Sequence, residues 1–556
     1  MQQQWWHGKT AYQIYPKSFY DSNGDGIGDI KGIIAKLPYL HALGIEILWI
    51  SPIYKSPFVD NGYDIADYQA IDPTFGTMED FDELLARAKE LGIAIIMDLV
   101  VNHCSSEHEW FKRACANPHG EEASYFYFRE GVDGHAPNNL RANFGGSVWD
   151  KVPGQDNLYY CHFFAKEQPD LNWFNPKLRQ KIYQMINWWL DKGVAGFRID
   201  AIMSIGKDPT FPNYTPDALG DGMCACGAMN AQCNDVATRF LQEMQATVFR
   251  PRRAFTVGEV FSLQEDNLAD FIGDEGNFST IFDFGPRQCV CNHCAYYAYD
   301  KLTIAQYRAA LFKSQRQAAH CGFIAPVIEN HDEPRGVSCY LPPMWHNAAG
   351  AKALGTIIML LRGIPFIYQG QELGMLNVQF NSIDEFNDLQ SVEEYRRCLQ
   401  HGLSKTEALA VLNAQARDHA RTPMPWTGGA QAGFTLGQPW MRLQQDYPQV
   451  NVAAQDKDPN SVLQHYRRLV ALKKEPSLQQ LLTYGSCEEV DTPYEAVICY
   501  RRTLDSQILY VAANFGEWDA TLHLPGARTM SLSTGKVQLQ GDKLHLDPGS
   551  SAVIVG

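Results

Sequence analysis

The stretch Val194-Ala-Gly-Phe-Arg198-Ile-Asp200 decides the fold, because an apolar run ends abruptly on a charged tip. Three other runs end in the same way: Ile93-Ala-Ile-Ile-Met-Asp98, Ala254-Phe-Thr-Val-Gly-Glu259 and Val327-Ile-Glu-Asn-His331-Asp332. A strand with an apolar body and polar residues at its carboxyl end is typical of a parallel barrel, whose active site lies at that face. A carboxylate is costly to bury unless it has partners or a task. We therefore predict one shared site rather than separate solvated strand ends.

Carboxylates that meet in this way are suited to cleaving glycosidic bonds. That chemistry needs one ionised carboxylate to attack the anomeric carbon and one protonated carboxyl to release the leaving oxygen. Arg198 lies two residues before Asp200, so both side chains share one face of a strand, and the cation should keep Asp200 ionised as the nucleophile. Glu259 has no cation next to it in the sequence, so burial can raise its pKa toward that of a general acid. Asp332, beside His331, would be the third carboxylate and would bind sugar hydroxyls.

These segments resemble the conserved regions of the alpha-amylase superfamily of retaining α-glycosidases, glycoside hydrolase family 13. The likeness is greatest to the oligo-1,6-glucosidase and α-glucosidase branch, and it extends from Trp5-Trp6 almost to the C-terminus. Further matching motifs are Tyr12-Gln-Ile-Tyr-Pro16, Asn61-Gly-Tyr-Asp64, Gln168-Pro-Asp-Leu-Asn172, Tyr368-Gln-Gly-Gln-Glu372 and Ala420-Arg-Thr-Pro-Met424. Their number, order and spacing make the resemblance specific. It implies an exo-acting, retaining α-glucosidase with a small oligosaccharide as its substrate.

Strand and helix signals alternate along the chain in the order that a (β/α)8 barrel requires. Apolar runs predict strands at 12–15, 45–50, 93–98 and 364–368, and Thr77-Met-Glu-Asp80 predicts a capped helix start. Pro326 interrupts the seventh strand, because proline removes a ladder donor, so we expect that strand to span only 327–329. The fold class is thus α/β: a (β/α)8 TIM barrel with an inserted domain B after the third strand and a C-terminal antiparallel β-sandwich.

Two changes of character along the sequence give the domain boundaries. A stretch rich in Asn, Gly, Pro and aromatic residues follows the third strand; loops of that length are usually functional, and in the family this one is domain B, a wall of the cleft. The last seventy-odd residues alternate apolar runs with turn signals, as in a sandwich. The expected barrel spans 1–101 and 172–478 with a helical insertion at about 371–460, domain B spans 102–171, and the sandwich spans 479–556.

The resemblance assigns residues that would hold the terminal glucose. Asp64 and Arg421 would pair with its 4- and 6-hydroxyls and close the far end of the pocket, which would make the enzyme exo-acting. Tyr63 would stack on the sugar ring. His103 and His331 would donate to hydroxyls near the developing charge.

Other residues would set the walls and the preferred linkage. Phe144, Phe164 and Gln168 would line the domain B side, and Arg335 would contact the leaving group. In this branch of the family, valine after the nucleophile resembles the α-1,6 type, whereas alanine or threonine resembles the α-1,4 type. Ala201 therefore favours α-1,4 over α-1,6 cleavage, with the unusual loop at 207–233 as the alternative determinant.

Several related activities stay open. An oligo-1,6-glucosidase (isomaltase) would use the same catalytic residues. Trehalose-6-phosphate hydrolase would need a cationic phosphate pocket, and no basic cluster marks the loops. Sucrose isomerase or transglucosylase would shield the intermediate from water, but the arginine-rich loop of the isomerases is absent around 284–288. Non-catalytic relatives that partner amino-acid transporters have a membrane helix and degraded catalytic residues, features that this sequence lacks.

The loop Asp21-Ser-Asn23-Gly-Asp25-Gly-Ile27-Gly-Asp29 matches the first nine positions of an EF-hand loop. Its twelfth position is Gly32 rather than glutamate, so the bidentate closing ligand is missing. A solvated acidic turn is the simpler interpretation. The family has a calcium-type site at this loop, however, and we expect a structural Ca²⁺ held by Asp21, Asn23, Asp25, Ile27 and Asp29, with no cofactor needed for catalysis.

Composition limits partners and location. A net charge of −16 argues against binding nucleic acid or an acidic membrane. No signal peptide or membrane span is evident, so we expect a cytoplasmic protein, a monomer or weak homo-oligomer. The fourteen cysteines are then expected to be thiols rather than disulfides. Metal binding stays an alternative for two clusters, Cys224/Cys226/Cys233 and Cys289/Cys291/His293/Cys294, although the one-residue gap in the second departs from the usual zinc spacing.

Overall fold

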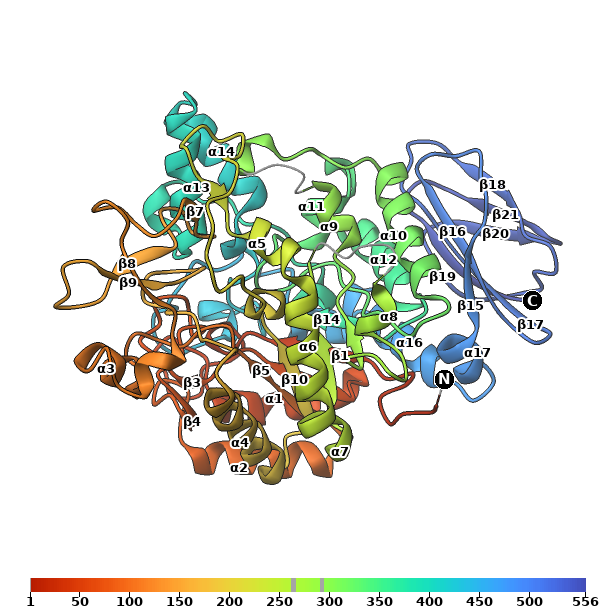
Figure 1. Ribbon diagram of the computed structural model, residues 1–556. Coiled ribbons are helices and arrows are strands. Elements are labelled where there is room, and N and C mark those ends of the chain that lie inside the picture. Colours follow the sequence, from red (N-terminus) through yellow and green to blue (C-terminus); the bar gives the residue numbers. More distant parts are fainter. Residues whose placement is uncertain (1, 262–266, 291–294) are drawn as a thin grey trace.

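A parallel barrel forms the centre of the molecule (Figure 1), in a computed structural model that describes residues 2–261, 267–290 and 295–556. Its seven regular strands hydrogen-bond in the order β13-β12-β10-β5-β2-β1-β14. They are β1 (Ala11–Ile14), β2 (Ile47–Ile50), β5 (Ala94–Leu99), β10 (Gly196–Ile199), β12 (Phe255–Gly258), β13 (Thr280–Ile281) and β14 (Phe366–Tyr368). Parallel bridges from Phe282 to Ala325 and from Ile324 to Gly363 fill the remaining position. The predicted eight-position barrel is therefore confirmed.

The seventh position differs from the prediction. The sequence placed that strand after Pro326, at 327–329, but the two bridged residues precede the proline. Pro326 cannot donate a ladder hydrogen bond, although its carbonyl accepts one from the N–H of Phe366 at 3.1 Å. The pairing ends at the proline, so the residues that follow leave the sheet and lead to His331 and Asp332.

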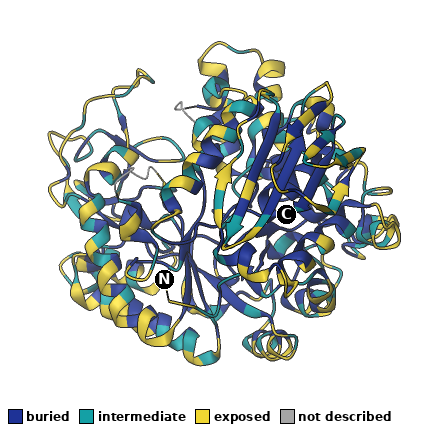
Figure 2. Ribbon diagram, turned by 90° about the vertical axis from the view of Figure 1, so that its right-hand side faces the viewer, coloured by how far each residue is buried: buried dark blue, intermediate teal, exposed yellow. Residues whose placement is uncertain are grey.

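Helices cover the outside of the barrel. They include α1 (Ile30–Leu43), α2 (Met78–Glu90), α4 (Pro176–Lys192), α6 (Asn234–Met244), α8 (Leu268–Phe271), α9 (Gly285–Val290), α10 (Ile304–Ala318), α11 (Gly336–Tyr340) and α12 (Ala348–Met359). At α2 the predicted cap is confirmed: Thr77 Oγ1 accepts from the N–H of Asp80, whose carboxylate accepts from the N–H of Thr77. Figure 2 shows buried strands inside and exposed residues on the outer helix faces, as expected for a covered parallel sheet.

Between β5 and α4 the chain leaves the barrel, as predicted for domain B. This segment contains α3 (Glu109–Ala116) and the antiparallel sheet β6-β9-β8, formed by β6 (Phe128–Glu130), β9 (Leu158–Cys161) and β8 (Trp149–Lys151). Its β7 (Leu140–Arg141) pairs in parallel with β11 (Cys224–Ala225), which belongs to the loop after β10. After β14 come α13 (Leu389–Gln400), α14 (Lys405–Gln415), α15 (Val452–Lys457), α16 (Val462–Lys474) and α17 (Gln479–Tyr484).

The C-terminal part is the predicted pair of antiparallel sheets. One sheet has the order β15-β16-β17-β22-β19 and the other β18-β21-β20. Their strands are β15 (Ser486–Glu489), β16 (Val497–Leu504), β17 (Gln507–Asn514), β18 (Ala520–His523), β19 (Thr529–Thr534), β20 (Val537–Gln540), β21 (Lys543–Leu546) and β22 (Ser551–Val555). Tyr500 and the fully buried Arg502 donate to the carbonyls of Ile357 and Leu360, which fixes this part to the end of α12. No helix in the described ranges is long and apolar enough to cross a membrane.

Candidate active site

Three carboxylates from neighbouring strands meet one guanidinium at the carboxyl end of the barrel. Strand register places Arg198 on β10 opposite Asp98 on β5 and Val257 on β12. Arg198 Nη1 lies 2.8 Å from Asp98 Oδ1 and 2.6 Å from Asp200 Oδ1. Arg198 Nη2 lies 2.6 Å from Glu259 Oε1. All four charged side chains are buried, so water screens their interactions little.

No cation stands next to Glu259 in the sequence, but in the fold Arg198 pairs with it as closely as with Asp200. Burial raises the pKa of Glu259 to about 7, and the charge of Arg198 only partly offsets this. Burial likewise raises the pKa of Asp200 to about 7, whereas the sequence predicted that Arg198 would keep it ionised. One guanidinium cannot neutralise three buried carboxylates, so the cluster retains a proton near neutral pH. Such a cluster can present one ionised and one protonated carboxyl together.

Asp332 is ionised because two guanidinium groups and an imidazole surround it. Arg417 Nη1 and Arg421 Nη2 lie 2.8 Å and 2.9 Å from its Oδ1. His331 Nε2 lies 3.1 Å from its Oδ2. Burial opposes ionisation, but His331 and Arg417 outweigh burial and hold the pKa of Asp332 well below its usual range. Asp332 therefore accepts hydrogen bonds and cannot serve as a proton donor near neutral pH.

Tyr63 connects the carboxylate cluster with His331. Its hydroxyl lies 3.0 Å from Asp98 Oδ2 and 2.5 Å from His331 Nε2, and the two rings stack with centroids 5.2 Å apart. His103 Nε2 lies 3.1 Å from the Tyr63 carbonyl and 3.0 Å from Gln168 Nε2. Burial lowers the pKa of His103 to about 3, so this ring is neutral at pH 7.

These groups border a cavity of about 430 Å³, a volume typical of small-molecule sites. The predicted site residues that line it are Tyr63, His103, Phe144, Phe164, Asp200, Ala201, Glu259 and Asp332. Arg198, Gln168 and His331 lie behind the lining, almost fully buried, and each contacts a lining residue through a hydrogen bond. These three residues therefore position the residues that line the cavity.

Three predicted substrate contacts do not reach the cavity. Asp64 is fully buried, and its carboxylate accepts from a serine hydroxyl and two backbone N–H groups. Arg421 contacts Asp332 from beneath the lining. Arg335 is fully buried and binds Glu329 and two backbone carbonyls. These side chains bind protein groups and lie outside the cavity lining, so their assignment to the sugar is corrected.

Asp60 and Arg417 occupy the places that the sequence gave to Asp64 and Arg421, and both line the cavity. Asp60 lies four residues before Asp64, and Arg417 lies four residues before Arg421. Burial raises the pKa of Asp60 to about 6, while Arg417 favours its ionised form. Arg417 also lies 5.5 Å from the ring centroid of Phe144. A carboxylate and a guanidinium therefore face the cavity together.

Ala201 combines an unusual backbone with a place in the lining. Its φ of 40° and ψ of 35° lie in the left-handed region, which β-branched residues rarely adopt. Its N–H donates to Glu259 Oε2 at 2.8 Å. The backbone of Ala201 therefore positions Glu259, and the residue is part of the cavity wall.

The loop after β10 and domain B form one continuous wall. Arg141, which is buried, makes ion pairs with Asp217 and Asp221 of that loop. Asn138 Nδ2 donates to the carbonyl of Phe211 at 3.2 Å, and apolar side chains of both segments share one core. The helix α5 (Gly227–Gln232) follows and contributes residues to the cavity lining. The loop that departs from the family is thus part of the cavity's construction.

Two residues that line the cavity, Phe261 and Glu333, were not predicted from the sequence. Phe261 lines the cavity and stacks on Phe284, with ring centroids 4.8 Å apart and planes 10° from parallel. Glu333 also lines it and makes an ion pair with Arg287. Phe261 lies two residues after Glu259, and Glu333 directly follows Asp332, so proximity to the strand tips was the available signal.

The Asp21–Asp29 loop is rich in oxygen atoms, although the carboxylates of Asp21, Asp25 and Asp29 do not all lie within 4.8 Å of one another. Asp21 accepts from three backbone N–H groups and a threonine hydroxyl. Asn23 and Asp25 each accept from the N–H two residues further on, which leaves oxygen lone pairs on both side chains. Asp29 accepts bonds on both carboxylate oxygens from its own loop and from α1. With the Ile27 carbonyl, this donor set is of the type that calcium prefers.

The cysteine clusters show no metal geometry where they are described. Cys224, Cys226 and Cys233 are buried among the aromatic residues of domain B and carry no disulfide. Within 2–261, 267–290 and 295–556, a triad of His, Cys or carboxylate ligand atoms within 4.8 Å occurs only elsewhere, on the C-terminal sandwich. In the second cluster, Cys291, His293 and Cys294 lie outside the described residues.

Comparisons with known proteins agree with this architecture. A family model for the alpha amylase catalytic domain matches residues 13–485. The chain belongs to the alpha-amylase family. Its relatives in this family include the oligo-1,6-glucosidase of Halalkalibacterium halodurans, 40% identical over 93% of this chain and 91% of that protein. The trehalose-6-phosphate hydrolase of Escherichia coli is 38% identical over 93% and 94% of the two chains.

Solved structures place the chain among alpha-amylase family enzymes with different reactions. The trehalulose synthase MutB from Pseudomonas mesoacidophila has a TM-score of 0.93 and 37% identity, with 100% of both chains covered. The isomaltulose synthase SmuA from Protaminobacter rubrum has the same TM-score at 36% identity. Membership of the alpha-amylase family makes this chain a glycoside hydrolase by class. Its linkage and product depend on the residues around its own cavity.

Proposed function

We propose that this chain is an exo-acting, retaining α-glucosidase that releases glucose from the non-reducing end of short α-glucosides. The observation that carries this proposal is the placement of Asp200 and Glu259 on the two terminal nitrogens of Arg198, at the edge of one cavity. Side-by-side carboxyl groups suit double displacement, whereas single displacement needs them far enough apart to admit a water molecule.

In the first step, an oxygen of ionised Asp200 attacks the anomeric carbon as the bond to the leaving oxygen breaks. Glu259 gives its proton to that oxygen, and the leaving sugar departs as a neutral alcohol. Glu259, now ionised, takes a proton from water, whose oxygen displaces Asp200 from the glucosyl carbon. Arg198 contacts both carboxylates throughout and compensates as negative charge moves from one to the other.

The remaining lining residues account for recognition of one terminal glucose. Asp332, which is ionised, accepts from hydroxyls near the reacting carbon. Asp60 and Arg417 offer an acceptor and a donor at the cavity wall, and we assign them to the hydroxyls far from the scissile bond. Tyr63 supplies an aromatic face and His103 a neutral hydrogen-bonding group.

Ala201 favours α-1,4 linkages, because its small side chain leaves room beside the acid–base carboxyl for the leaving sugar of maltose. The second candidate is α-1,6 cleavage, which is favoured by the names of relatives such as the Halalkalibacterium halodurans oligo-1,6-glucosidase. Phosphorylated substrates are disfavoured: Arg417 is the single Lys or Arg among the described lining residues, and it is already paired with Asp332 and Asp388.

Glucose release from maltose, isomaltose, sucrose and trehalose 6-phosphate tests these assignments. We expect the highest kcat/KM on maltose, a lower value on isomaltose and little activity on trehalose 6-phosphate. Maltooligosaccharides whose non-reducing end is blocked should not be cleaved. Cleavage of blocked chains would contradict the exo assignment, and conversion of sucrose to isomeric disaccharides without glucose would favour an isomerase.

We also propose that the Asp21–Asp29 loop binds a structural Ca²⁺, supported by its oxygen donors and side-chain lone pairs. The ion would stabilise the first barrel loop through Asp21, Asn23, Asp25, the Ile27 carbonyl and Asp29. It has no part in the bond-breaking steps. Isothermal calorimetry with CaCl₂ on chelator-treated protein measures this binding directly, and no saturable heat would contradict it.

A further inference from the structure

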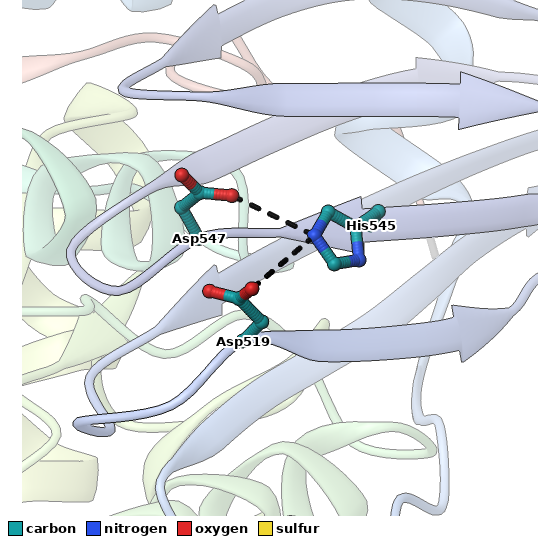
Figure 3. A group of neighbouring side chains, drawn as sticks. All are labelled: Asp519, His545 and Asp547. Atoms are coloured by element: carbon teal, nitrogen blue, oxygen red, sulfur yellow. Dashed lines mark ion pairs between the residues drawn. The ribbon is translucent and has the colours of Figure 1, made fainter.

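Three side chains of types that can ligate a metal ion cluster on the C-terminal sandwich, outside the barrel (Figure 3). Asp519, His545 and Asp547 each offer a ligand atom, and these atoms all lie within 4.8 Å of one another. Asp519 directly precedes β18, His545 lies on β21, and Asp547 directly follows β21. Two turns and a strand therefore bring these side chains to one point.

Strand pairing holds the imidazole in place. Thr521 on β18 lies opposite His545 on β21, and Thr521 Oγ1 is 3.1 Å from His545 Nδ1. When Nδ1 carries the proton and donates to this hydroxyl, the Nε2 lone pair faces the two carboxylates. A hydrogen bond from the second ring nitrogen is the usual way in which a metal-ligating histidine is oriented.

The separations leave room for an ion. His545 Nε2 lies 3.6 Å from both Asp519 Oδ2 and Asp547 Oδ1. A direct charge-assisted hydrogen bond would be about 2.7–2.9 Å long. At the other end of the same strand pair, His523 and Asp542 do make direct contact, at 2.6 Å. Metal–ligand distances of about 2.0–2.1 Å place the corners of a tetrahedron about 3.4 Å apart, close to the separations at His545.

We propose that Asp519, His545 and Asp547 bind a zinc-type divalent metal ion, with water as the fourth ligand. One imidazole and two carboxylates suit zinc and similar transition metals, whereas calcium takes six to eight oxygen ligands. The three side chains are 59%, 40% and 31% exposed, so an ion reaches them from solvent. The bound ion ties the turn before β18 to the turn after β21 and stabilises this end of the sandwich.

Zinc titration by isothermal calorimetry tests the proposal on chelator-treated, full-length protein kept reduced. His545→Ala and Asp519→Asn should each bind one zinc ion fewer than the wild type. Thr521→Val, which removes the hydroxyl behind the imidazole, should weaken that site by about 10- to 100-fold. His523→Ala is the matched control, because it removes an exposed imidazole from the same strand pair and should leave the stoichiometry unchanged.

Anomalous diffraction at the zinc edge, from wild-type crystals soaked in zinc, locates the ion independently of any variant's folding. The proposal predicts a peak between the three side chains, with the imidazole Nε2 as a ligand. Equal stoichiometry in the wild type and His545→Ala, or zinc peaks only at thiols or at His523, would overturn it. These readouts do not depend on glycosidase activity.

Discussion

Replacing Glu259 by glutamine removes the acidic proton of the proposed general acid but keeps the shape of the side chain. Glutamine has nearly the same volume and keeps an oxygen for the N–H of Ala201, but it cannot protonate the leaving sugar. Loss of a positioned general acid lowers rates by about 10²–10⁴-fold. We expect kcat on maltose to fall by that factor, while KM changes little because the cavity contacts are retained.

The same substitution should stabilise the protein at alkaline pH. Burial raises the pKa of Glu259 from 4.5 to about 7, so folding disfavours its ionised form. Each unit of difference in pKa between the folded and unfolded states corresponds to about 1.4 kcal/mol. Ionised Glu259 therefore lowers the free energy of unfolding by about 3 kcal/mol above pH 7. Below pH 4.5 the group is protonated in both the folded and unfolded states, and this cost disappears. Glutamine mimics the protonated form and removes the cost at every pH.

Calorimetric melting at one scan rate, at pH 5 and pH 8, measures the stability difference, and glucose release measures the rate. The Tm gain of Glu259→Gln over the wild type should be larger at pH 8 than at pH 5. Glu333→Gln is the matched control, because burial also raises the pKa of Glu333 to about 7, yet it should lose far less activity. A wild-type rate in Glu259→Gln, or a Tm difference that is the same at both pH values, would refute the reasoning.

Further predictions concern the cavity wall, the linkage, the loop and the ion. Arg417→Lys keeps the charge but loses the forked contacts of the guanidinium. Since a hydrogen bond to a charged group contributes about 1.5–3 kcal/mol, kcat/KM for maltose should fall at least about tenfold. An unchanged value would show that Arg417 does not bind the substrate. Ala201→Val should lower the maltose-to-isomaltose ratio of kcat/KM by at least about tenfold. Ala201→Ser, which changes the side-chain volume little, is the control and should preserve that ratio, and an unchanged ratio in Ala201→Val would exclude Ala201 as the selector. Asp217→Asn weakens the ion pair with Arg141 and should raise KM more than it lowers kcat; a fall in kcat alone would contradict the loop's binding role. Asp21→Asn should abolish any rise in Tm that CaCl₂ gives the wild type, and the same rise in both proteins would contradict the calcium site.

The strand tips could be predicted from the sequence because they depend on local pattern. Apolar runs that end on Asp98, Asp200 and Glu259 are buried strands, and parallel strands bring their carboxyl ends to one face. The cap at Thr77 is equally local. By contrast, the contact between Arg198 and Glu259 depends on the register between β10 and β12, which no local pattern encodes.

The cavity wall could be predicted only in part, because it is built from loops. Asp60 and Asp64 are both acidic and four residues apart, and only the path of their loop decides which one faces the cavity. The same holds for Arg417 and Arg421. At Pro326 the chemistry was recognised correctly, but whether pairing stops before or after a proline depends on the neighbouring strands.

The anomeric form of the first glucose released tests the central claim most directly. Proton NMR during the first turnovers on 4-nitrophenyl α-glucoside, whose leaving group is not a sugar, distinguishes the two anomers when enough enzyme is used to outrun mutarotation. Two successive displacements through Asp200 retain the configuration, so α-glucose should appear first and β-glucose only as mutarotation proceeds. Initial release of β-glucose would mean a single displacement by water, and would contradict the assignment of Asp200 as a nucleophile beside Glu259.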